Sequence, residues 1–92
     1  MNDFIHVGFG NIVNRNKVIA IVSPEGAPIR RMVSNSRDNG SSIDATHGRK
    51  TRSVLFMEGG QLVLSALSPE TLLRRSGIEI DGYGMNDPED DV

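Results

Sequence analysis

A continuous run of five apolar residues, Val18-Ile19-Ala20-Ile21-Val22, most constrains what this chain can fold into. Four of the five are β-branched, and such side chains favour strands because their χ1 rotamers are restricted. Successive strand side chains point to opposite faces, so the run predicts a strand buried on both faces of a sheet. The polar segment 14–16 before it predicts a turn, and the Pro- and Gly-containing segment 23–28 ends the strand.

Further strand-like segments are short and separated by turn residues. Alternation predicts that Ile5, Val7 and Phe9 share one strand face, with Gly8 and Gly10 allowing a bend or bulge. The Glu58-Gly59-Gly60 segment predicts a hairpin between two apolar strands. In the segment that precedes them, we expect a strand with Ile43, Ala45 and His47 on one face. The expected strands comprise residues 5–10, 12–13, 18–22, 41–47, 53–57 and 61–67.

Two segments carry helix signals. Pro28 suits a first helical turn, the following apolar stripe has helical spacing, and Asn39-Gly40 marks a stop. The second segment, 68–77, has a serine cap, a proline, an early glutamate and a basic last turn. The sequence therefore predicts a small single α+β domain, with a twisted, mainly antiparallel sheet of about five to six short strands and two short helices. The stripe of the first helix consists of Ile29, Met32, Val33 and Ser36.

Charge is divided unevenly along the 92 residues. Residues 1–75 contain ten basic and six acidic side chains, a net charge of +4, whereas residues 76–92 contain six acidic side chains and no basic one. We expect a folded domain over residues 1–77 and an acidic, flexible tail over residues 78–92. A basic body with an acidic tail suits nucleic-acid binding moderated by the tail, and it also suits an ordinary domain with a solubilising end.

Catalytic and cofactor chemistry has little support in the sequence. There is no cysteine, and His6 and His47 lack metal-ligand spacing, so we expect no metal site, no cofactor and no enzymatic activity. Asp44 and His47 fall on opposite faces of the expected strand, which argues against a catalytic dyad. A dinucleotide site at residues 8–10 lacks the third glycine and a following helix. No apolar run approaches the roughly 20 residues of a membrane helix, so a cytoplasmic protein is expected. Since no catalytic or nucleotide-binding pattern is supported, we expect no small-molecule substrate.

Basic side chains gather on two strand connections. Phe4, Phe9 and Phe56 occupy strand-like, buried positions in this interpretation, which argues against a base-stacking platform for single strands. Phosphate contact on double-stranded DNA is then the preferred hypothesis, with repetition in a symmetric assembly raising avidity. Two alternatives remain open: a solvated loop, and a protein-interaction or scaffold module that docks an acidic partner. The expected DNA-binding residues are Arg15 and Lys17 on the first connection, and Arg49, Lys50 and Arg52 on the second.

Several motifs closely resemble one bacterial family. They include the glycine-containing segment 8–13, the strand and proline segment 18–24, the segment 27–32, the segment 43–52, and Leu64-Ser65-Ala66 with Pro69-Glu70-Thr71. Together they resemble the RemA family over roughly residues 4–75. The resemblance implies a non-enzymatic, DNA-binding transcriptional regulator of extracellular-matrix and biofilm genes. It also implies a closed, ring-shaped homo-oligomer that is associated with the nucleoid and takes DNA on its outer surface.

The resemblance also implies roles for particular positions. Arg49, Lys50 and Arg52 fall on the family's basic segment, Lys17 falls on a basic position at the first turn, and Pro28 falls in a segment implicated in protomer packing. Lys17 and Lys50 stand where members often carry Arg, so their phosphate contacts lose the bidentate fork. His47 replaces a usual Tyr, Ser41-Ser42 replace more apolar residues, and the acidic tail is outside the pattern. These departures leave the target promoters open.

Overall fold

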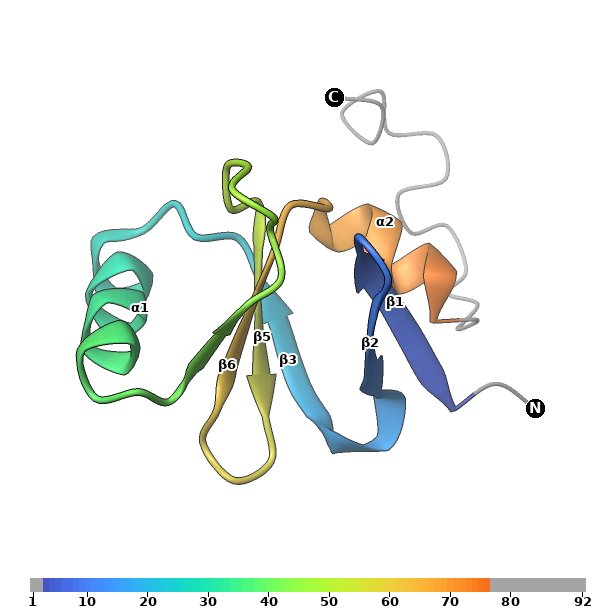
Figure 1. Ribbon diagram of the computed structural model, residues 1–92, viewed down its shortest axis with the longest axis horizontal. Helices are drawn as coiled ribbons and strands as arrows, with labels where there is room; N and C mark the ends of the chain where they lie inside the picture. Colours follow the sequence, from blue (N-terminus) through green and yellow to red (C-terminus); the bar gives the residue numbers. More distant parts are fainter. Residues whose placement is uncertain (1–2, 77–92) are drawn as a thin grey trace.

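The computed structural model describes residues 3–76, which form three layers (Figure 1). A four-stranded sheet lies in the middle, with helix α1 on one side and a two-stranded hairpin with helix α2 on the other. The α+β class, the two short helices and the expected number of strands are confirmed, although the strands divide between two sheets. The elements are β1 Phe4–Gly8, β2 Asn11–Asn14, the 3-10 turn η1 Arg15–Lys17, β3 Val18–Val22, α1 Ala27–Asp38, β4 Ser42–Asp44, β5 Ser53–Met57, β6 Leu62–Ser65 and α2 Pro69–Arg75.

The pairing is mainly antiparallel, as expected. β1 pairs with β2, and the larger sheet has the order β3-β5-β6-β4, in which β5 is antiparallel to both neighbours. β4 is parallel to β6, because α1 carries the chain across the sheet between β3 and β4. The 58–60 hairpin between β5 and β6 is confirmed, with φ near 100° at both glycines.

The core consists of two clusters on the two faces of the larger sheet. Leu55 of β5 and Val63 of β6 pack with Ile5 and Val7 of β1 and with Leu72 of α2. On the opposite face, the second cluster covers the sheet under α1. It contains Val33, Val54, Leu62 and Leu64, with Val22, Ile29 and Phe56 packed against them. The two central strands are therefore the ones buried on both faces.

The expectation that β3 is buried on both faces is wrong. β3 is an edge strand, and its Ile19 side chain is 70% exposed. The apolar run is long enough for a central strand, but the centre is occupied by β5 and β6, which pair with each other through a hairpin. An edge strand that is apolar on its exposed side is available for contact with another chain.

Two other expectations about strand faces need correction. The strand expected over 41–47 ends at Asp44. Ile43 and Ala45, which were expected on one face, differ in burial: Ile43 is 56% exposed, whereas Ala45 is buried. Phe9 does not continue β1 beside Ile5 and Val7, because the chain turns there with a φ of 55°, and its side chain is 47% exposed. Gly8 and Gly10 allow this turn, and the pairing register shifts between His6 and Gly8, which confirms the expected bulge or bend.

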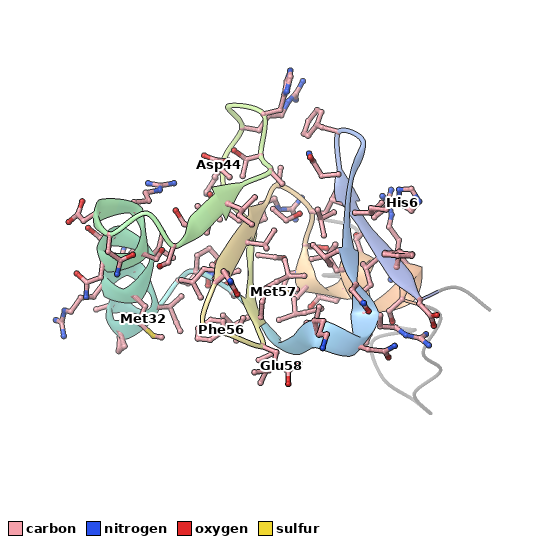
Figure 2. The ribbon with its side chains drawn as sticks, turned by 60° about the horizontal axis from the view of Figure 1, so that its bottom comes forward. His6, Met32, Asp44, Phe56, Met57 and Glu58 are labelled. Carbon is pink, nitrogen blue, oxygen red and sulfur yellow. The ribbon has the colours of Figure 1, made fainter. Side chains whose placement is uncertain are left out.

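Both helices begin as expected. Ser68 caps α2 by accepting a hydrogen bond from the Thr71 amide, and Leu72 of α2 is fully buried. In α1, Val33 is buried while Met32 is 43% exposed and points outward (Figure 2), so the buried stripe is narrower than expected. The predicted boundary between domain and acidic tail, at residues 77 and 78, lies outside the described residues.

Candidate nucleic-acid interface

Residues 45–52, here called the basic loop, project from one end of the larger sheet. The amide of Ala45 donates to the Leu64 carbonyl at 2.8 Å, and the amide of Arg52 donates to the Ser65 carbonyl at 2.8 Å. Because Leu64 and Ser65 are neighbours on β6, the loop leaves and returns to the sheet at almost the same place. The residues between these anchors therefore extend beyond the strands, and Arg49, Lys50 and Arg52 are exposed.

The loop is held in a compact turn at its start. The Asp44 carboxylate accepts hydrogen bonds from the amide and hydroxyl of Thr46, and the Arg49 amide donates to the Thr46 carbonyl at 3.0 Å. His47 and Gly48 follow with φ of 55° and 81°, which reverses the chain direction. Asp44 and His47 thus serve different contacts, and they do not lie on one strand as expected, because β4 ends at Asp44.

An aromatic contact joins the loop to the tip of the β1–β2 hairpin. The rings of Phe9 and His47 stack with centroids 4.9 Å apart and planes 19° apart. The guanidinium carbon of Arg49 lies 5.7 Å from the centre of the Phe9 ring, within cation–π distance. Sequence reasoning missed Phe9 because alternation placed it on a buried strand face. The glycines on both sides of it were the available signal of a turn.

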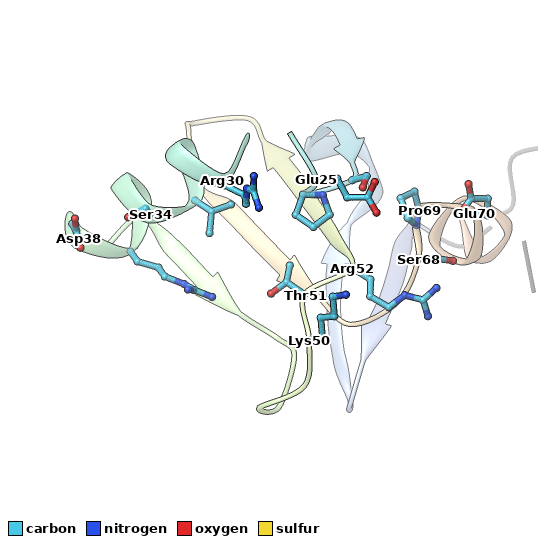
Figure 3. Close-up of a pocket in the computed structure, with 14 residues that line it drawn as sticks. Glu25, Arg30, Ser34, Asp38, Lys50, Thr51, Arg52, Ser68, Pro69 and Glu70 are labelled. Carbon is cyan, nitrogen blue, oxygen red and sulfur yellow. The ribbon is translucent and has the colours of Figure 1, made fainter. Parts of the chain in front are cut away.

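Lys50 and Arg52 line an open groove of about 1110 Å³ between α1 and the beginning of α2 (Figure 3). Arg30 and Arg37 of α1 line the same groove. Acidic side chains are interspersed with these cations, so the groove has no single sign of charge. The basic loop, in contrast, contains no acidic residue. The acidic residues of the groove are Glu25, Asp38 and Glu70.

Arg15 and Lys17 lie at the other end of the sheet. Lys17 precedes Val18, which pairs with Met57 at the end of β5, whereas Arg52 precedes the beginning of β5. At 3.4 Å per residue, the five-residue strand separates the two ends by about 14 Å. In Figure 2, Asp44 and Glu58 mark these opposite ends. The chain therefore presents two separate sets of cations, rather than one cluster.

Arg15 and Lys17, the cations of the first strand connection, also make contacts within the fold. The Arg15 guanidinium donates from Nη1 to the Ser76 carbonyl at 2.7 Å, next to the end of α2. The Lys17 ammonium lies 3.2 Å from a Glu58 carboxylate oxygen, in an ion pair that is more than half exposed. Exposed pairs of this kind contribute little to stability, so Lys17 can exchange Glu58 for another anion. Among residues 3–76, neither Arg49 nor Lys50 has an acidic partner within 4.0 Å.

Pro28 lies in the first turn of α1 and is exposed. Met32 follows one turn later on the same side, and the two form a small exposed apolar surface. Two of the aromatic residues that were expected to be buried are also exposed, Phe4 at 46% and Phe9 at 47%. The expected burial of aromatic residues, which argued against base stacking, is therefore wrong at these two positions.

Within residues 3–76, no three His, Asp or Glu side chains gather as a metal site would require. None of the helices in this part of the chain is long and apolar enough to cross a membrane. The features that remain are cation-bearing connections at both ends of one sheet and apolar side chains at its open edges. They define a small α+β domain whose exposed surface is basic at two strand connections and apolar at two sheet edges.

Comparison with known proteins assigns the family. The chain belongs to the RemA-like family, described as extracellular matrix regulatory protein A-like, whose model matches residues 4–75. A regulatory protein of Lachnoclostridium phytofermentans is 56% identical over 75 residues, which is 82% of each chain. One from Carboxydothermus hydrogenoformans is 56% identical over 72 residues, 78% of this chain and 83% of the relative. One from Bacillus pumilus is 51% identical over 75 residues, 82% and 84% of the two chains.

Proposed function

We propose that this protein is a non-enzymatic, DNA-binding transcriptional regulator that contacts the phosphates of duplex DNA through its basic loop. The observation that carries the proposal is the geometry of that loop. Arg49 and Lys50 lie between the two hydrogen-bonded anchors of the loop, and Arg52 is exposed at the second anchor. The described part of the chain offers Arg49 and Lys50 no acidic partner. The names of the relatives describe them as regulatory proteins, and these names agree with this role. By family resemblance, the regulated genes include those of the extracellular matrix and biofilm.

Phosphate contact suits the chemistry of these side chains. Arg offers a planar fork that can donate two hydrogen bonds to one phosphate, and Lys supplies a compact positive charge. Such contacts contribute affinity and release counterions, but they read little base sequence. We expect specificity to come from repeated contacts and from the bendability of the DNA. Lys17 and Arg15 would supply a second set of contacts at the other end of the sheet.

A closed ring of identical protomers is the assembly that we propose. Ile19 on β3 is 70% exposed and Ile43 on β4 is 56% exposed, and these strands are the two opposite edges of one sheet. Two different apolar edges favour a head-to-tail contact between copies, which forms a ring when the rotation closes. Pro28 and Met32 add exposed apolar surface on α1, in agreement with a role for Pro28 in protomer packing.

The test is DNA binding by the triple variant in which Arg49, Lys50 and Arg52 are replaced by Ala. We expect wild-type affinity for duplex DNA to fall steeply with salt. In the variant, we expect the slope of log K against log salt to become less negative by about 2.7, which corresponds to three lost phosphate contacts. Fluorescence anisotropy with a labelled duplex at several salt concentrations measures both affinity and slope.

The matched control replaces Arg31, Arg74 and Arg75 by Ala. It removes the same charge from exposed positions outside the basic loop and the groove lining. Equal losses in the two triple variants would assign binding to net charge rather than to the loop. If the loop variant binds duplex DNA with wild-type affinity, the basic loop is not part of the DNA interface.

A protein-interaction or scaffold module that docks an acidic partner is the second candidate function. The groove beside Lys50 and Arg52 favours it, because a mixture of charges suits a protein surface better than a phosphate chain. In that case the purified protein would leave the mobility of duplex DNA unchanged even at low salt. Binding to a protein partner, with weak dependence on salt, would then be the positive result.

A further inference from the structure

We propose that Phe9, at the tip of the β1–β2 hairpin, is a positioning residue that holds Arg49 for phosphate contact. The role rests on the proposed function, because Arg49 is expected to meet DNA. It adds an uncharged residue from a distant part of the sequence to the interface. In this role Phe9 contacts the guanidinium group and the loop, and the guanidinium group contacts the phosphate.

The Phe9 ring touches the basic loop at two places. It stacks on the His47 ring with centroids 4.9 Å apart and nearly parallel planes, and the Arg49 guanidinium carbon lies 5.7 Å from its centre. An aromatic face attracts a cation through its quadrupole, so the ring defines a preferred place for the guanidinium group. The contact with His47 fixes the ring itself.

Backbone strain coincides with this contact. Phe9 and His47 each have a φ of 55°, and they are the two residues other than glycine with positive φ in residues 3–76. Residues of this kind adopt the left-handed region uncommonly, and they keep it when surrounding contacts compensate. Here the two strained residues face each other in the stack. The hairpin tip and the loop therefore hold each other in conformations that neither prefers alone.

Burial does not account for the position of Phe9, because its side chain remains 47% exposed. The basic loop is otherwise tied at its base by Ala45 and Arg52, and inside its turn by the Thr46 carbonyl. Contact with the hairpin tip therefore restrains the outer part of the loop. An Arg side chain that is already restrained loses less conformational freedom when it binds phosphate, which increases affinity.

Lys50 provides an internal comparison. It lies next to Arg49 in the same loop and lines the groove instead, without a ring contact in the described part of the chain. Phe9 should therefore be coupled to Arg49 and independent of Lys50. This difference separates a positioning role from a general effect of the hairpin on folding.

The experiment combines Phe9→Asn with Arg49→Ala and, separately, with Lys50→Ala. Asn removes the ring but tolerates the left-handed backbone, so the hairpin tip can keep its shape. Phe9→Tyr keeps the ring and serves as the conservative variant. The dissociation constant for a short duplex, the oligomer mass and the melting temperature are measured for every variant.

We expect Phe9→Asn to weaken DNA binding about two- to five-fold, the range of an exposed cation–π contact, and Phe9→Tyr to bind like the wild type. In the Lys50→Ala protein the same loss should recur, whereas in the Arg49→Ala protein Phe9→Asn should add none. Equal losses in both backgrounds would overturn the positioning role and indicate a structural one. Wild-type affinity in the Phe9→Asn protein would overturn it as well.

A second readout needs no DNA. Stacking on Phe9 should shift the NMR resonances of the His47 ring protons upfield, and Phe9→Asn should abolish the shift. Absence of the shift in the wild type would overturn the positioning role while leaving DNA binding untouched. If the shift is present but the wild type binds no duplex at low salt, the proposed function fails and the role in phosphate contact fails with it.

Discussion

The Asp44 carboxylate accepts two hydrogen bonds from Thr46, one from its hydroxyl at 2.6 Å and one from its amide at 2.9 Å. The bond from the hydroxyl, and then the bond from the amide, hold the pKa of Asp44 below its ordinary value of 3.8, with a further contribution from the charge of Arg37. This carboxylate fixes the point at which the chain leaves β4 and the basic loop begins. One short polar turn thus lies at the start of the loop that carries three cations.

Acid should therefore loosen the start of the basic loop. Because the folded pKa of Asp44 is lowered, its contribution to stability is fully present above the unfolded value and is lost as the pH falls through the folded value. We expect melting temperature to decrease more steeply below about pH 4 in the wild type than in Asp44→Asn, whose amide oxygen accepts the same bonds without titrating. Thermal unfolding between pH 5 and pH 2 measures this. Identical curves for the two proteins would contradict it.

Phe9 and His47 show what a residue pattern could not predict. Alternation placed both on strands, because apolar or aromatic side chains at every second position fit a period of two. Their positive φ values coincide with a contact between them that spans a long interval of sequence, which a local pattern does not encode. The cations of the basic loop, in contrast, were predictable, since three charged side chains between two strands cannot be buried.

At the scale of elements, Ser65 joins the small hairpin to the larger sheet. Its buried hydroxyl donates to the Val7 carbonyl at 2.7 Å and accepts from the Leu67 amide at 3.1 Å. The Ser65 carbonyl accepts the hydrogen bond from the Arg52 amide that closes the base of the basic loop. One residue of β6 thus ties together β1, the segment before α2 and the base of the candidate interface.

Ser65→Ala should destabilise the protein by about 1–3 kcal/mol, because one buried and one partly buried backbone group lose the hydroxyl as a hydrogen-bond partner. Urea unfolding at a fixed protein concentration measures the change, since the proposed assembly would contribute to apparent stability. Ser34→Ala, at an exposed position of α1, is the control and should change stability by less than about 0.5 kcal/mol. Similar unfolding midpoints for the two variants would contradict the role of Ser65.

The elements themselves were mostly predictable, but the place of β3 in the sheet was not. Helix caps and hairpin glycines are local signals, and the structure confirms the elements that they predicted. The run over 18–22 contains no information on whether its second face is covered by the same chain or by another copy. The same apolar pattern fits a central strand in a protein core and an edge strand in the proposed contact between copies. The sequence therefore did not reveal that Ile19 is 70% exposed in the single chain.

On the scale of the whole molecule, the two sets of cations lie beyond opposite ends of one sheet, whose strand β5 spans about 14 Å. Five contacts on one domain would bind DNA weakly at physiological salt. In the proposed ring, each protomer repeats both sets around a circumference, so a long duplex can meet several protomers at once. Binding then becomes intramolecular after the first contact, and avidity increases with DNA length.

Ile19→Lys should separate assembly from DNA contact. Because Ile19 is largely exposed, the substitution should change protomer folding little, whereas a charge on the edge strand should block contact between copies. Sedimentation velocity should show a smaller particle, with Ile19→Val retaining the wild-type mass. On a short duplex, we expect Ile19→Lys to bind like the wild type.

On a long duplex, the wild type should bind at least ten-fold more tightly than on a short one, whereas Ile19→Lys should lose this gain. Replacing Arg49, Lys50 and Arg52 by Ala should weaken binding on both lengths, because each contact is lost wherever it occurs. Titration of both duplexes with the three proteins distinguishes loss of avidity from loss of the site. Tight binding of the long duplex by a dissociated Ile19→Lys protein would show that the ring is not the source of affinity.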